Sequence, residues 1–108
     1  MAVDARTLER VRQILAGRDD VEEKRMVGGR SFLVQGQLCC GVNGQGLVVR
    51  LGDGVAQALQ EAHVRPLMMG RREVSAFVVV DPEGYADDEA LTRWVSRGVA
   101  AVQERGSR

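Results

Sequence analysis

The 108-residue chain has few of the residues that most often build reactive, stacking or cross-linked sites. It contains two cysteines, one histidine, two phenylalanines, one tyrosine and one tryptophan. Two neighbouring cysteines do not make the disulfide framework of a small secreted domain. No hydrophobic run reaches membrane-spanning length, and the N-terminal segment lacks the apolar core of a signal peptide. These absences predict a cytoplasmic protein that does not insert into a membrane.

The chain also lacks an excess of either charge. Fifteen basic residues balance fifteen acidic ones, so no overall field draws the protein to nucleic acid or to an anionic membrane. So few aromatic residues also exclude the stacking platform of a single-strand binder, and direct nucleic-acid binding is not expected. The densest basic patch is Arg65, Arg71 and Arg72, which could contact an anion or a partner's acidic surface. A solvated loop is the alternative interpretation.

Helical periodicity is clear in three places. Apolar residues recur at helical spacing between Asp4, a predicted N-cap, and Gly17. A short helix is predicted after Asp53, which is placed to cap it. The last helix follows Asp87, its predicted cap, with one apolar stripe expected to cover a sheet. That stripe comprises Leu91, Trp94, Val95, Gly98, Val99 and Val102.

Alternation of apolar and polar residues predicts the sheet. The expected strands lie at 21–26, 31–35, 38–42, 47–51 and 74–80. Glycine-containing turns separate the first four strands, and Asn43-Gly44 is the strongest hairpin signal. The chain is therefore predicted to form one α+β domain over residues 1–108, with residues 103–108 as a frayed tail. Its mostly antiparallel sheet of about five strands is flanked by helices, in the order α-β-β-β-β-α-β-α.

The two cysteines are the main candidates for chemistry. Alternation along a regular strand would point Cys39 and Cys40 to opposite faces, with Cys40 in the core. Cys39 is then the candidate reactive thiol if it is exposed, with His63 as the only available imidazole base. Nothing in the spacing brings those two residues together, so no catalytic residue is predicted. The cysteines, the histidine and the methionines could bind a soft metal, but they lack the spacing of a metal site. The glycines match no phosphate-binding loop. No metal or cofactor is therefore predicted either.

Several short motifs together resemble one known family. They are Lys24-Arg-Met-Val-Gly-Gly29, Cys40-Gly-Val42, His63-Val-Arg-Pro66, Phe77-Val-Val-Val-Asp-Pro-Glu-Gly84, and Trp94-Val95. Their order and spacing resemble the TfoX N-terminal domain family, also called the Sxy family. The resemblance implies a fold similar to secretion chaperones, frequent dimers and no established catalytic residues. In the namesake, this domain precedes a helical domain, and the protein promotes competence gene expression together with the cyclic AMP receptor protein.

The sequence therefore predicts a small non-enzymatic binding or regulatory module that acts through protein contacts. A homodimer and a protein partner in transcriptional regulation are expected, as the resemblance implies. A thiol-dependent enzyme or redox sensor that uses Cys39 is the alternative. DNA binding within a transcriptional complex is a third hypothesis, which rests on the namesake alone.

Overall fold

The computed structural model describes residues 5–26 and 28–106. The elements are α1 (Ala5–Leu15), β1 (Val21–Met26), β2 (Gly29–Val34), β3 (Gln37–Asn43), β4 (Gly46–Arg50), the 3-10 turn η1 (Gly52–Gly54), α2 (Val55–Ala58), β5 (Val64–Met69), β6 (Arg72–Val80), the 3-10 turn η2 (Pro82–Tyr85) and α3 (Asp88–Gly106). The predicted N-cap Asp4 lies outside the described residues. Helix α3 includes residues 103–106 of the tail that the sequence predicted as frayed.

The predicted α+β class and the antiparallel sheet are confirmed, but the sheet has six strands instead of about five. They lie in the order β1-β2-β3-β4-β6-β5, and each neighbouring pair is antiparallel. The predicted Asn43 hairpin is confirmed, since Asn43 opposes Gly46 and its Oδ1 accepts a bond from Gln45 N at 2.8 Å. Short hairpins thus connect β1 to β4 without a crossover.

The strand that the sequence analysis did not predict is β5, which lies between the predicted short helix and the predicted strand at 74–80. Pro66 has no N–H to donate, but β5 is an edge strand, where proline is tolerated. The register with β6 shifts between Pro66 and Met68. A turn through Gly70, with φ of 67°, returns the chain to β6. The prediction that Asp53 caps the short helix is also wrong. Asp53 lies inside η1, and Gly54 is the N-cap of α2, without a side-chain cap bond.

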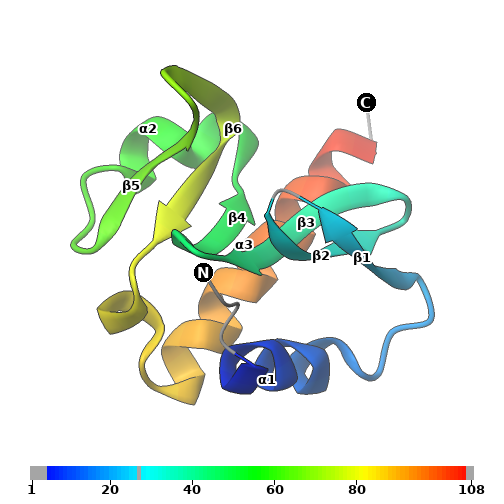
Figure 1. The fold of residues 1–108 in the computed structure, drawn as a ribbon. Coiled ribbons are helices and arrows are strands. Elements are labelled where there is room, and N and C mark those ends of the chain that lie inside the picture. The colour runs from blue at the N-terminus through cyan, green and yellow to red at the C-terminus, as the bar shows by residue number, and fades with distance from the viewer. Residues whose placement is uncertain (1–4, 27, 107–108) are drawn as a thin grey trace.

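The main core lies between one face of the sheet and the helices. Helix α1 lies along the bottom of the view in Figure 1, and α3 crosses behind the sheet. The predicted α3 cap is confirmed, because Asp87 Oδ1 accepts a bond from Ala90 N at 2.7 Å. None of the described helices is both long and apolar enough to cross a membrane. The buried core includes Leu8, Val11 and Leu15 of α1, Phe32, Val34, Val42, Leu47, Val49, Val78 and Val80 of the strands, and Leu91, Trp94, Val95 and Val102 of α3.

A second, smaller apolar cluster lies on the other face of the sheet. Val48 is buried there, whereas its neighbours Leu47 and Val49 point into the main core, as strand alternation requires. Val48 packs with Leu67 and Val79, and the half-buried Val74 and Phe77 complete the cluster. Within the described ranges, every member of this strand-only cluster comes from β4, β5 or β6. The two faces of the sheet are therefore covered differently.

Candidate functional site

The structure places Cys39 in the core, whereas the sequence analysis predicted it on the face of the strand opposite Cys40. Phe32 opposes Cys40 and Leu33 opposes Leu38, so Cys39 is an extra residue in β3 without a partner in β2. Such a bulge changes the direction of the side chains that follow it. Both thiols have no exposed surface, and they form a hydrogen bond with each other. The prediction that they point to opposite faces is wrong.

The contact between the thiols makes them unequal. The hydrogen bond from Cys40 lowers the pKa of Cys39, and the charges of Arg18 and Arg50 act in the same direction against the effect of burial. The bond and burial raise the pKa of Cys40 well above its ordinary value. Cys39 is thus the thiol that would ionise first. Cys39 lies under α3, however, and has no exposed surface. A substrate could reach its sulfur only if the helix moved.

His63, the predicted base, lies elsewhere in the fold. It is exposed, has a φ of 69°, and lies beside Gly84, where an added Cβ would be 3.1 Å from His63 Cβ. Cys39 instead contacts α3 at Gly98, where an added Cβ would be 3.0 Å from Cys39 Sγ. The structure does not bring the thiol and the imidazole into one site.

The predicted arginine patch is divided into two parts. Arg65 Nε lies 2.8 Å from Asp81 Oδ1, and another nitrogen of Arg65 donates to Gln45 O, so this guanidinium ties β5 to the residue after β6 and to the turn between β3 and β4. Arg71 and Arg72 are exposed at the turn between β5 and β6. Met69 lies beside them and is 54% exposed. We call residues 69–72 the hairpin tip.

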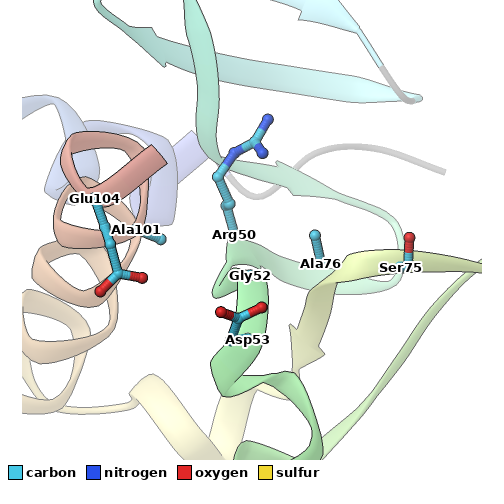
Figure 2. Close-up of a pocket in the computed structure, with 7 residues that line it drawn as sticks. All are labelled: Arg50, Gly52, Asp53, Ser75, Ala76, Ala101 and Glu104. Carbon is cyan, nitrogen blue, oxygen red and sulfur yellow. The ribbon is translucent and has the colours of Figure 1, made fainter. Parts of the chain in front are cut away.

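A pocket that the sequence analysis did not find lies between β6, η1 and α3 (Figure 2). Its volume is about 310 Å³. Ala76 lines it with a φ of 74°, a conformation that favours glycine and that no sequence signal indicated. The positive φ occurs where β6 bulges, since four residues from Val74 to Phe77 stand opposite Leu67 alone. The lining residues are Arg50, Gly52, Asp53, Ser75, Ala76, Ala101 and Glu104.

The polar side chains that line this pocket belong to two carboxylic acids, a serine and an arginine. Asp53 and Glu104 present their carboxylates at the pocket, whereas Arg50 points away from them (Figure 2). Arg50 Nε donates to Leu38 O, and its guanidinium lies 4.8 Å from the ring centre of Phe77. Carboxylates on two walls could accept a cationic group. The residues that line the pocket include neither a cysteine nor a histidine.

Comparison with known families decides the assignment that the motifs suggested. The family model described as the TfoX N-terminal domain matches residues 13–102. The chain belongs to this family. Searches of curated proteins and of solved structures gave no match. The match includes β1 to β6 and most of α3, so it applies to the sheet and to the main core.

In this TfoX N-terminal domain, several family motifs meet where β6 passes into α3. Gly84 lies so close to β6 that an added Cβ would be 2.6 Å from Val80 Cγ1. Its carbonyl oxygen accepts a hydrogen bond from Trp94 Nε1 at 3.3 Å. Asp81 holds Arg65 in the ion pair described above. These contacts explain physically why glycine, tryptophan and aspartate suit these positions.

Proposed function

We propose that this TfoX N-terminal domain is a small regulatory module that binds another protein and does not catalyse a reaction. Membership of the family supports a regulatory role. The observation that carries the proposal is the hairpin tip, where Met69 is exposed, together with the half-buried Val74 and Phe77 of the strand-only cluster. The other members of that cluster, Val48, Leu67 and Val79, are buried.

The chemistry of this surface indicates the kind of partner. Val74 and Phe77 are half-buried, and Met69 exposes a flexible apolar side chain that can adapt to different contacts. Arg71 and Arg72 add two guanidinium groups at the hairpin tip, which suit carboxylates through paired hydrogen bonds. One exposed methionine, two half-buried apolar side chains and two arginines fit a partner segment that is apolar and acidic.

The other parts of the proposal follow the family assignment. We place the module in transcriptional regulation, in the cytoplasm and as a homodimer. The two free cysteines are compatible with a reducing compartment. The burial of Cys39 supports a non-enzymatic role, because a thiol enzyme or redox sensor needs an accessible thiolate.

Capture of partners by purified full-length protein, followed by a titration with each purified candidate, tests the proposal. We expect Met69→Glu and Arg71→Glu each to weaken the interaction at least about tenfold, as for residues central to an interface. Arg93→Glu is the matched control, because Arg93 is exposed on α3, on the side of the sheet that the helices cover. A partner that binds all three variants equally would contradict the proposed surface. If the protein captured no partner and turned over a small molecule, the proposal of a binding module would be contradicted.

A further inference from the structure

The sheet has two edge strands, and only one of them is regular. At one edge, β5 contains Pro66 and a register shift, both of which interrupt the ladder that an added strand would need. At the other edge, β1 pairs with β2 without a shift over its whole length, from Val21 to Met26. Among the described elements, β1 pairs only with β2. An added strand would therefore find a continuous template at β1 alone.

The hydrogen bonds show which groups of β1 face outward. Gln35 N donates to Asp20 O at 2.9 Å, and Asp20 directly precedes β1. Backbone groups alternate in direction along a strand, so those of Glu22 and Lys24 face β2 as well. The N–H and C=O groups of Val21, Glu23 and Arg25 consequently point away from the sheet. These three residues are spaced to pair with an antiparallel strand.

We propose that a second copy of this chain pairs antiparallel with β1 and that a two-fold axis passes beside Glu23. This inference rests on the homodimer in the proposed function, and it names the surface that forms it. The axis must be perpendicular to the sheet, because opposed residues in an antiparallel pair point to the same face. Val21 then opposes Arg25 of the partner subunit, and every outward N–H and C=O of the three residues has a partner.

On the face of the sheet opposite the helices, this register places opposite charges beside each other. Glu22 and Lys24 lie on that face, and Lys24 Nζ is 3.7 Å from Glu22 Oε2. In the dimer, Glu22 opposes Lys24 of the partner subunit, and symmetry repeats the pair. Opposite charges in directly opposed positions stabilise an antiparallel pair, whereas like charges destabilise it. The order Glu-Glu-Lys-Arg in β1 is thus compatible with its own copy.

The charges on the helix face allow Glu23 to lie beside its own copy. Both carboxylate oxygens of Glu23 accept bonds from Arg12 at 2.8 Å, and Arg30 Nε lies 3.5 Å away. Each carboxylate therefore brings two guanidinium groups to the axis. A register centred on Lys24 would instead place two ammonium groups together, and within the described part of the chain each has just the longer ion pair to Glu22. The register centred on Glu23 is electrostatically better.

Sedimentation velocity of the full chain over a concentration series tests this inference. We expect a concentration-dependent dimer in which Glu22→Lys or Lys24→Glu raises the dissociation constant about tenfold, because each puts like charges in two opposed positions. The double variant E22K/K24E restores opposite charges and should return the constant to near the wild-type value. Arg25→Pro removes an outward N–H but no bond to β2, so it should also weaken the dimer.

Controls separate loss of pairing from loss of folding. Far-UV circular dichroism and Trp94 fluorescence report whether each variant is folded, and Glu83→Lys is a charge reversal at an exposed position in η2, outside both edge strands, that should leave the dimer unchanged. A chain that stays monomeric at high micromolar concentration would overturn the inference, because the edge charges then only prevent pairing. A dimer that ignores the charge exchange would overturn it too. In either case, capture of a partner by the hairpin tip would still support the proposed function.

Discussion

Gly98 sets how closely α3 packs on β3. A Cβ at this position would lie 2.8 Å from Cys39 O and 3.0 Å from Cys39 Sγ. We predict that Gly98→Ala lowers the free energy of unfolding by about 1 to 3 kcal/mol, as overpacking of a core does, although alanine favours a helix. Urea denaturation measures the change.

Ser96→Ala is the control for the effect of alanine on the helix itself. Ser96 is exposed on α3, so its replacement should change the free energy of unfolding by less than about 0.5 kcal/mol. Adding Cys39→Ala to Gly98→Ala should recover only part of the loss, because the carbonyl oxygen stays in place. An increase in stability for Gly98→Ala would show that α3 is not held at this distance.

The thiols give a second prediction at the scale of single residues. Cys39 and Cys40 have no exposed surface, so we expect both to react with iodoacetamide at neutral pH far more slowly than a free thiol peptide. Unfolding in urea should bring the rate up to that of the peptide. Mass spectrometry of the alkylated chain over time measures both rates. Rapid modification of native Cys39 alone would favour the thiol-dependent alternative.

The orientation of Cys39 shows a limit of prediction from alternation. The period of two placed Cys40 correctly in the core, because Cys40 lies on the regular part of β3. A bulge at Cys39 turned this residue to the same side, and one extra residue in a strand leaves no signature in an apolar run. The residue types were informative, but the direction of one side chain depended on pairing with another strand.

At the scale of elements, an ion pair joins α1 to the edge strand β1. The hydrogen bond from Arg12 lowers the pKa of Glu23 below its ordinary value of 4.5, with the charges of Arg12 and Arg30 in the same direction and burial against it. A carboxylate with a lowered pKa stabilises the fold above the unfolded-state pKa, and this stabilisation is lost as pH falls through the folded-state pKa.

We therefore predict that Glu23→Gln is less stable than wild type at pH 7 and that the difference disappears as pH falls well below 4.5. Urea denaturation at several pH values, at one low protein concentration, measures the difference. Glu9→Gln is the matched control, because Glu9 contacts Arg12 by a single bond of 3.4 Å. Its effect at pH 7 should be smaller. A difference for Glu23→Gln that is the same at pH 3 and pH 7 would contradict the electrostatic explanation.

The elements differ in how well the sequence predicted them, and the reason is physical. Helix α3 has its own cap at Asp87 and a long apolar stripe, so local signals specify it. Strand β5 has Pro66 and consecutive methionines in place of alternation, and only its pairing with β6 makes it a strand. The hairpin tip and the pocket at Ala76 depend on that same pairing. The sequence therefore indicated Arg71 and Arg72 but grouped them with Arg65, which contacts Asp81 and Gln45 instead, and it gave no signal of the pocket.

At the scale of the whole molecule, the two faces of the sheet share the same strands. Val48 and Val79 of the strand-only cluster alternate with Val49 and Val80 of the main core. A loss of packing on one face must therefore disturb strands whose other side chains pack on the opposite face. We infer that both clusters unfold as one cooperative unit, as most single domains of this length do.

Leu67→Ala tests that coupling, because Leu67 is 3% exposed and belongs only to the strand-only cluster. We predict a loss of about 2 to 4 kcal/mol in the free energy of unfolding, the usual cost of a cavity left by leucine. Trp94 lies in the main core, so its fluorescence reports the other face. The urea midpoints from Trp94 fluorescence and from far-UV circular dichroism should fall together. Met69→Ala, at an exposed position, should leave both midpoints nearly unchanged. If Leu67→Ala lowers the circular dichroism midpoint but not that of Trp94, the two faces unfold separately, and a partner could then order the strand-only face without affecting the helices.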